Sequence, residues 1–218
     1  MKLIALPDLP GDIQRLDGLA DHLSVADVVL LVGDITNAGG ASGAAKVVDA
    51  VRRYNPSILA IPGNWDDLDV STYLTREKIN LHRRHVIIDQ IAFAGAGGSL
   101  PAPVRTPNEV TETELQSNLA AAVAGLNEQV PIILVCHQPP IRTLNDQLDE
   151  QTHVGSEAVR AFIEATQPLA CFTGHIHEGV GIDTIGRTKI VNPGPLSNGG
   201  YAYAEITRQG IWVECRQL

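Results

Sequence analysis

Short apolar runs recur along the first two-thirds of the chain and alternate with segments of helical periodicity. Runs of four or five residues that are rich in Val, Ile and Leu are typical of strands buried on both faces of a sheet. We expect such strands at Leu3–Leu6, Val28–Val32, Ile58–Ile61, Val86–Ile88, Ile91–Ala94, Ile132–Cys136 and Leu169–Phe172.

Two of the intervening segments are predicted to be helices. Leu115 and Leu119 lie on one face at helical spacing, and Thr111 and Glu114 stand just before them at the spacing of a capping box. The second helix is expected over about residues 156–166, where apolar side chains again repeat with helical periodicity.

The pattern changes after residue 178, where strands separated by glycine-containing turns predict an antiparallel meander. Alternating strands and helices followed by a run of strands indicate a layered α/β fold with mixed sheets. At 218 residues, without a linker or an internal repeat, the chain is expected to form one domain over residues 1–218. The late strands are expected at Val180–Ile185, Lys189–Val191, Tyr201–Ile206 and Ile211–Cys215.

Composition and charge narrow the class of protein. Hydrophobic residues make up 44% and charged residues 19%, which is ordinary for a globular protein. No apolar run approaches the roughly 20 residues of a membrane span, and the first apolar stretch is too short for a signal peptide, so a cytoplasmic protein is expected. The net charge of −9 disfavours nucleic acid as a partner. Three cysteines without CxxC spacing are expected to be buried rather than paired.

Ligand-type residues follow five of the predicted strands directly. Because the carboxyl ends of strands in α/β sheets meet at one crevice, these side chains are expected to converge there. They are Asp8, Asp34, Asn64, His137, His175 and His177.

Each of these residues has an ordinary structural alternative, since an Asp after a strand often caps a helix and a lone buried His is usually part of the core. Their joint recurrence favours a metal site. Carboxylate, amide oxygen and imidazole without thiolate suit Mn, Fe, Zn or Ni, and six ligands suffice for two ions that share a carboxylate. Three further histidines, His22, His82 and His85, lack this context and are expected at the surface.

The same residues carry a resemblance to the calcineurin-like metallophosphoesterases. The order and spacing are those of the family motifs, which extend here from Asp8 to about Pro195. The motifs read Asp8-Leu9-Pro10-Gly11, Gly33-Asp34, Gly63-Asn64-Trp65-Asp66, Val135-Cys136-His137 and Gly174-His175-Ile176-His177.

The resemblance implies a four-layer sandwich of two mixed β-sheets flanked by helices. It also implies that Asp34 bridges two divalent metal ions, and that a metal-bound hydroxide attacks phosphorus in line. Asn64, His137 and His175 would complete one metal site, whereas Asp8 and His177 would belong to the other.

Two positions depart from the family pattern. The first motif normally reads Asp-x-His, but Pro10 occupies the third position, so the second metal site loses a ligand and one firmly bound ion is an alternative to two. Asp12 and Asn37 are conceivable substitutes, with a helix cap and a turn residue as their ordinary roles. Trp65 replaces a His that in many relatives contacts phosphate and protonates the leaving group, and Trp cannot act as an acid.

The remaining candidates for substrate contact lie at the start of the second predicted helix. His153 could replace the missing acid, and the amides of Gly155 and Ser156 could receive a phosphate oxygen. The alternative is that Ser156 is a plain helix cap and His153 lies on a loop.

The sequence therefore favours metal-dependent hydrolysis of a small-molecule phosphate ester, with a phosphodiester slightly preferred over a phosphomonoester. The competing hypothesis is a catalytically silent metal- or phosphate-binding module, motivated by Pro10. Substrate choice is expected to reside in the loops Leu100–Pro107 and Pro139–Gly155.

Overall fold

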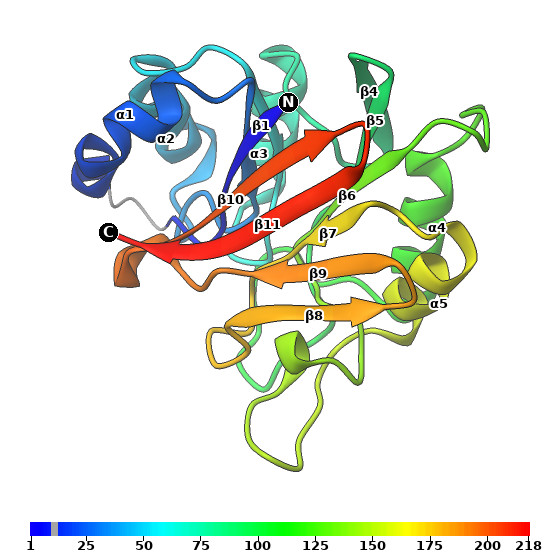
Figure 1. The fold of residues 1–218 in the computed structure, drawn as a ribbon. Coiled ribbons are helices and arrows are strands. Elements are labelled where there is room, and N and C mark those ends of the chain that lie inside the picture. The colour runs from blue at the N-terminus through cyan, green and yellow to red at the C-terminus, as the bar shows by residue number, and fades with distance from the viewer. Residues whose placement is uncertain (10–12) are drawn as a thin grey trace.

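The computed structural model describes residues 1–9 and 13–218. Two β-sheets are packed against each other and are flanked by helices in the described part of the chain (Figure 1). The first sheet has the order β11-β10-β1-β2-β3. Its strands are β1 (Lys2–Leu6), β2 (Val28–Val32), β3 (Ile58–Ile61), β10 (Gly200–Thr207) and β11 (Gly210–Gln217).

The second sheet has the order β4-β5-β6-β7-β9-β8. Both sheets are mixed. In the first, β1, β2 and β3 are parallel up to one edge and β10 and β11 add antiparallel pairs on the other side, whereas in the second, parallel strands form the centre and an antiparallel pair lies at each edge. The strands of the second sheet are β4 (Arg84–Ile88), β5 (Ile91–Ala96), β6 (Ile132–Cys136), β7 (Ala170–Phe172), β8 (Gly181–Ile185) and β9 (Thr188–Asn192).

The helices form two groups, one beside each sheet (Figure 1). Next to the first sheet are α1 (Ala20–Ser24), α2 (Gly40–Arg52) and α3 (Leu68–Arg76). Next to the second are α4 (Glu112–Ala122) and α5 (Glu157–Thr166). Short 3-10 helices are η1 (Ile13–Leu19), η2 (Leu144–Asp146) and η3 (Leu196–Asn198). None of the helices in the described residues is long and apolar enough to cross a membrane.

The apolar runs are continuous because the central strands are buried on both faces. In β1, Leu3 and Ala5 pack into the core between the two sheets, whereas Ile4 and Leu6 pack under the helices of the first group. Successive side chains of a strand point to opposite faces, so both sets must be apolar. The predicted α/β architecture of two mixed sheets flanked by helices is confirmed.

The prediction of one antiparallel meander after residue 178 was wrong. The last four strands form two separate hairpins, β8–β9 in the second sheet and β10–β11 in the first. Alternation along a strand identifies its buried face but not the sheet to which it belongs, and the segment around η3 carries the chain from one sheet to the other. The cysteines are free, with Cys136 and Cys171 buried as predicted and Cys215 half-buried.

Strand direction positions the candidate site. Strands β1, β2 and β3 are mutually parallel, and so are β5, β6, β7 and β9. The segments that follow β1, β2 and β3 therefore emerge at one edge of the first sheet. The residue after β6 reaches the same place, because its side chain bonds the carbonyl of Val32 at the end of β2.

Candidate metal centre

Two aspartates, Asp8 and Asp34, follow the neighbouring strands β1 and β2 and line one cavity. Both side chains are buried, and both backbones are left-handed, with φ of 49° and 46°. Residues other than glycine rarely adopt this conformation, so the surrounding structure holds each aspartate in place. The N–H of Asp8 donates to Gly33 O at 3.2 Å, and that of Leu9 donates to Asp34 O at 2.9 Å, which ties the two segments together.

A third aspartate, Asp66, joins the segment after β2 to the segment after β3. Its buried carboxylate accepts from the backbone N–H groups of Ile35 at 3.0 Å, Thr36 at 2.8 Å and Gly63 at 2.8 Å. Burial raises the pKa of Asp66 to about 6, and the nearby Asp34 adds to the rise. Asp66 is thus a buried support rather than a ligand facing the cavity.

Gly63 allows the two segments to approach closely. A Cβ atom at this position would lie 2.1 Å from both the backbone N and Oδ1 of Asp34, so no larger residue fits. Two residues on, the N–H of Trp65 donates to Asp34 Oδ1 at 2.9 Å. One carboxylate oxygen of Asp34 is therefore fixed from the backbone.

His137 follows β6 and is fully buried between the two sheets' loops. Its Nδ1 lies 2.9 Å from Val32 O, and a carbonyl can only accept, so Nδ1 carries a proton. Its Nε2 lies 3.0 Å from Asn64 Oδ1 and 3.4 Å from Asp34 Oδ2. Gly33 makes room for the ring, since a Cβ there would lie 2.4 Å from Nδ1. The nitrogen that faces the other ligand-type residues is therefore Nε2.

The charges of this group are coupled. Burial alone would lower the pKa of His137, but the attraction of the Asp34 carboxylate, with a further contribution from Asp8, raises it to about 9. Burial would likewise raise the pKa of Asp34, but His137 holds it below its usual value. Without a metal, a proton on Nε2 compensates the buried carboxylates, and a cation that bound there would displace it.

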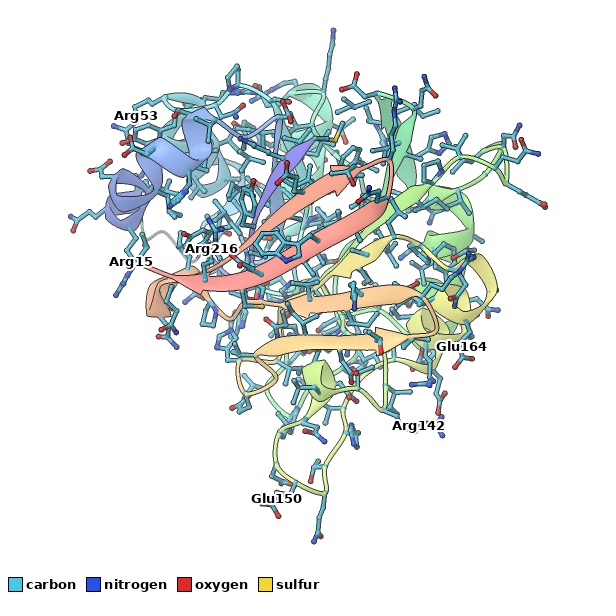
Figure 2. All side chains as sticks on the ribbon, in the orientation of Figure 1. Arg15, Arg53, Arg142, Glu150, Glu164 and Arg216 are labelled. Carbon is cyan, nitrogen blue, oxygen red and sulfur yellow. The ribbon has the colours of Figure 1, made fainter. Side chains whose placement is uncertain are left out.

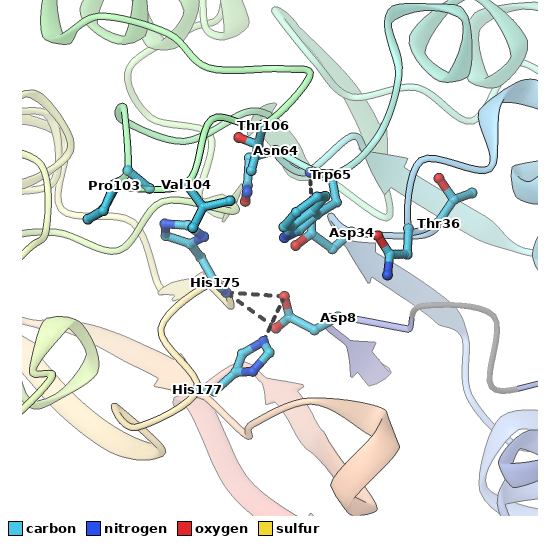
Figure 3. Close-up of a pocket in the computed structure, with 12 residues that line it drawn as sticks. Asp8, Asp34, Thr36, Asn64, Trp65, Pro103, Val104, Thr106, His175 and His177 are labelled. Atoms are coloured by element: carbon cyan, nitrogen blue, oxygen red, sulfur yellow. Dashed lines mark hydrogen bonds and ion pairs between the residues drawn. The ribbon is translucent and has the colours of Figure 1, made fainter.

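His175 and His177 reach the cavity from the segment after β7. The N–H of His175 donates to both carboxylate oxygens of Asp8 at 3.3 Å, and His177 Nε2 lies 3.7 Å from Asp8 Oδ1 (Figure 3). A Cβ at Gly174 would lie 2.6 Å from Asp8 Oδ2, so glycine permits this approach. Burial and the charge of His137 lower the pKa of His175 to about 3, whereas Asp8 raises that of His177.

The geometry fits a divalent metal. Donor atoms of Asp8, Asp34 and His137 all lie within 4.8 Å of one another, and all three residues are buried. His175 is neutral and has its ring centroid 5.2 Å from that of His137. Two buried carboxylates beside imidazoles and the amide of Asn64 are the oxygen and nitrogen donors that borderline transition metals accept.

Two of the residues that bear on the second metal site lie outside the described residues. They are Pro10, which replaces the family's ligand His, and Asp12, a proposed substitute ligand. The other proposed substitute, Asn37, lines the cavity and is exposed. It stands on the rim of the same hollow as Asp8 and His177.

The structure does not place His153 or Gly155 at the cavity. His153 Nδ1 lies 2.7 Å from Asp146 Oδ1, and the N–H of Gly155 donates to Asp146 Oδ2 at 2.9 Å. Neither lines the cavity in the described part of the chain. The prediction of substrate contact for these two residues is not supported, because both serve to fold their own loop around a buried carboxylate.

Ser156 is likewise occupied. Its N–H donates to Pro139 O at 2.9 Å and its hydroxyl to Glu112 at 2.6 Å, and the hydroxyl also caps α5. The Glu112 carboxylate further accepts from the N–H groups of Glu157 and Ala158. A carboxylate of the chain therefore sits where a phosphate was expected, so the alternative role of Ser156 as a helix cap is the observed one.

The three other histidines are half-buried rather than at the open surface. His82 Nδ1 accepts from the N–H of Gly97 at 2.9 Å, and burial lowers the pKa of His82 to about 4. His85 Nδ1 lies 2.9 Å from Ala122 O. These contacts are structural, and they could not be inferred because they join segments distant in sequence.

The cavity that contains the ligand-type residues has a volume of about 490 Å³. Its ligand-type side chains are those of Asp8, Asp34, Asn64, His175 and His177 (Figure 3). The remaining lining residues are Thr36, Asn37, Trp65, Ala102, Pro103, Val104 and Thr106.

Comparison with known proteins identifies the family. The sequence model of the calcineurin-like phosphoesterase superfamily domain matches residues 1–207. The chain belongs to this superfamily. A relative from Methanocaldococcus jannaschii, the uncharacterized protein MJ1162, is 37% identical over 201 residues, which are 90% of this chain and 89% of the relative. The resemblance inferred from the motifs is thereby confirmed.

Solved structures agree with the superfamily fold. Protein TT1561 of Thermus thermophilus superposes with a TM-score of 0.75 at 21% identity, covering 98% of this chain and 97% of its own. Purple acid phosphatase PPD1 from yellow lupin gives a TM-score of 0.59 at 12% identity, covering all of this chain and 51% of its own. At these identities the likeness shows the fold.

Sequence reasoning found the ligand-type residues but missed part of their surroundings. Asp66 belongs to a quoted motif, yet no local signal showed that it binds three backbone N–H groups. The segment Leu100–Pro107 was expected to influence substrate choice, and its residues Ala102 to Val104 do line the cavity. Its composition alone could not show which wall it forms.

Proposed function

We propose that this protein hydrolyses a phosphate ester with the help of divalent metal ions. The observation that carries the proposal is the convergence of Asp8, Asp34 and His137 within 4.8 Å beside an open cavity. Buried carboxylates that approach so closely need a compensating cation. They come from separate loops that the fold brings together. Membership of the superfamily gives the same reaction class.

The ligand roles follow from position. Asp34 stands between the two groups, with Oδ2 directed to His137 and Oδ1 held by a backbone N–H, which suits a carboxylate shared by two ions. Asn64, His137 and His175 would hold one ion with it. Asp8 and His177 would hold the second, on the more exposed side. We propose Mn, Fe, Zn or Ni for these ions on the basis of the donor set.

Bound divalent ions would supply the positive charge that acidifies a water molecule and neutralises phosphate oxygens. The chain's own residues have three tasks. His137 presents Nε2 in a fixed orientation because Nδ1 is bound to Val32 O. Asn64 holds its amide oxygen against that imidazole. The Asp66 bonds hold both loops in register.

We prefer a phosphodiester to a phosphomonoester. Among the described lining residues, those that are not ligands carry no group that titrates near neutral pH, so the leaving group must depart without a strong acid beside it. The same described lining contains two aspartates and no Lys or Arg. A diester with one negative charge is repelled less by these carboxylates than a monoester with two.

The second candidate is a silent metal- or phosphate-binding module. It is favoured by Pro10, which offers no donor atom where the family motif has a His. A protein of this kind would bind one ion and show no turnover.

Hydrolysis of bis-p-nitrophenyl phosphate by metal-stripped protein, titrated with Mn²⁺, separates the two candidates. The active enzyme requires turnover that rises with Mn²⁺ and is lost in Asp34→Asn. Asp89→Asn is a matched control, because Asp89 has φ of 47° like Asp34 but lies exposed at a hairpin turn. Metal binding without turnover of this diester or of p-nitrophenyl phosphate, in folded protein, would contradict the hydrolase.

A further inference from the structure

Exposed apolar side chains stand directly beside the ligand-type residues of the cavity. Trp65 is 36% exposed and Val104 is 65% exposed, and both line the cavity together with Ala102 and Pro103. Figure 3 shows the Trp65 ring beside Asp34, with Val104 and Pro103 across the hollow near His175. Apolar walls with a few convergent polar groups are typical of small-molecule sites. We call Trp65, Ala102, Pro103 and Val104 the apolar wall.

The backbone of Trp65 is held in this position by two hydrogen bonds. Its N–H donates to Asp34 Oδ1 at 2.9 Å, and its carbonyl accepts from the N–H of Ala38 at 3.0 Å. Both bonds belong to the backbone, so the point from which the indole extends into the cavity is fixed relative to the proposed bridging carboxylate. The indole itself offers a large aromatic face beside the ligand-type residues.

The opposite part of the apolar wall is fastened to the same segment. The N–H of Asn108 donates to Asn64 O at 3.0 Å, and its side chain donates to Gly63 O at 2.8 Å. Thr106 is anchored to Glu109 by its N–H and its hydroxyl. The loop that carries Val104 is thus tied at its base to the residues beside the metal cluster, which fixes both sides of the hollow.

The charge of the lining limits what can occupy it. No Lys or Arg is among the described residues that line the cavity. Arg105, in the same loop as Val104, is exposed and is not among these lining residues. Bound metal ions could accept one phosphate group of a substrate. A second phosphate group on the same molecule would lie against the apolar wall, where no cation would compensate its charge.

We propose that the substrate carries a single phosphate joined to a flat ring system, and that Trp65 is the residue that selects it by stacking. The proposal rests on the proposed function, because it takes the phosphate to be held at the metal ligands. The ring lies against Trp65 and faces the side chains of Ala102, Pro103 and Val104. Offset stacking on the indole adds to the burial of apolar area on both sides.

Phosphonates test this selection without hydrolysis, since their C–P bond is not cleaved. Calorimetric titration of Zn²⁺-loaded protein compares phenylphosphonate, which has a ring beside phosphorus, with methylphosphonate, which has none. We expect phenylphosphonate to bind at least about tenfold more tightly, equivalent to about 1.4 kcal/mol. A second pair, adenosine 5′-monophosphate against ribose 5-phosphate, tells whether the stacked ring adjoins the phosphate or lies beyond a sugar.

Variants assign the selection to Trp65. Trp65→Ala is expected to reduce the phenyl-to-methyl ratio to about twofold or less, whereas Trp65→Phe should keep most of it. Both variants retain the backbone bond to Asp34, so methylphosphonate should bind them as it binds the parent. Trp212→Phe removes the other tryptophan, which is 50% exposed on β11, and should leave every ratio unchanged.

The outcomes separate this inference from the proposed function. Equal binding within both pairs would show a phosphate site without ring selection and would overturn the inference alone. An unchanged ratio in Trp65→Ala would overturn the role of Trp65. Failure of all four ligands to bind the metal-loaded protein would overturn both proposals.

Discussion

Two contacts between a histidine and a buried aspartate in this molecule differ in their surroundings. His137 faces Asp34 at 3.4 Å beside the cavity, and His153 faces Asp146 at 2.7 Å within the loop that precedes α5. Both aspartates are buried. The shorter contact lies away from the cavity, so distance alone does not identify the pair that is proposed to bind metal.

The difference lies in how far each carboxylate is already satisfied. Asp146 accepts from the N–H groups of Arg142 at 3.2 Å, Thr143 at 2.8 Å and Gly155 at 2.9 Å, besides its contact with His153. Its acceptor capacity is used by its own loop. Asp34, by contrast, accepts one backbone N–H and directs its other oxygen toward a cluster of donors at an open cavity. A carboxylate with remaining acceptor capacity can bind a metal ion.

The largest effect expected from this comparison is on turnover at the cavity. Asp8→Asn should lower metal-dependent hydrolysis of bis-p-nitrophenyl phosphate by about 10³-fold, because a metal ligand contributes several kcal/mol of charge stabilisation. Asn tolerates the left-handed backbone at this position and can still accept from His175 N–H, so folding should persist. Steady-state kinetics with added metal measures turnover, and urea denaturation of the metal-free protein measures stability. A loss of turnover that is fully explained by unfolding of the variant would contradict a ligand role.

The second prediction concerns Asp146, where we expect an effect on stability rather than on turnover. Asp146→Ala leaves several buried N–H groups without acceptors, so the free energy of unfolding should fall by about 3 kcal/mol. Turnover per folded molecule should stay within about twofold, because Asp146 does not line the cavity in the described part of the chain. Urea denaturation and metal-dependent kinetics on the same preparation provide the test. A loss of turnover without a loss of stability would place this loop in the active site.

These two pairs also show what the sequence could and could not predict. Asp8, Asp34 and His137 were found because each directly follows an apolar strand, and parallel strand ends converge by geometry. His153 also precedes a helix with a good cap, a local pattern that fits an anion site equally well. Only the tertiary contact between Glu112 and the start of α5 shows that the site is filled by the chain itself.

The fold was predictable to a similar degree and for a similar reason. Continuous apolar runs identified the buried central strands, since both faces must be apolar there. The assignment of the last strands to two sheets depends on how the chain crosses near η3, which local alternation does not encode. The apolar wall could not be foreseen either, because Trp65 and Val104 come from distant segments that Asn108 brings together.

The third prediction uses a histidine for which burial is the largest cause of the pKa shift. Burial lowers the pKa of His82 to about 4 from an ordinary value near 6.5, and the charges of Arg83 and Arg84 add to the shift. The unfolded chain therefore takes up a proton as the pH falls below about 6.5, whereas the folded chain does not until about pH 4. The contribution of His82 to stability is complete above this window and is lost as the pH falls through it. Each unit of pKa shift corresponds to about 1.4 kcal/mol, and because His82 is only half-buried we expect a smaller total loss, of about 2 kcal/mol.

His82→Asn is the matched variant. Asn places an acceptor near the position of Nδ1, so the bond from the N–H of Gly97 can persist, but it does not titrate. Urea denaturation between pH 4 and pH 7 should show a shallower loss of stability in the variant than in the parent. Identical slopes would mean that other groups, such as the carboxylates of the metal site, account for the whole acid sensitivity.

The smallest effect is expected at His153, because its contact with Asp146 lies within its own loop. His153→Asn keeps a donor within reach of Asp146, so stability should change by no more than about 1 kcal/mol. Turnover of bis-p-nitrophenyl phosphate and of an alkyl phosphodiester should each stay within about twofold, since neither leaving group is protonated from this loop. A fall of more than about tenfold for the alkyl ester alone would have a different meaning, because only a poor leaving group needs an acid. His153 would then donate a proton at the cavity, and its loop would have to move toward Asp34 when substrate binds.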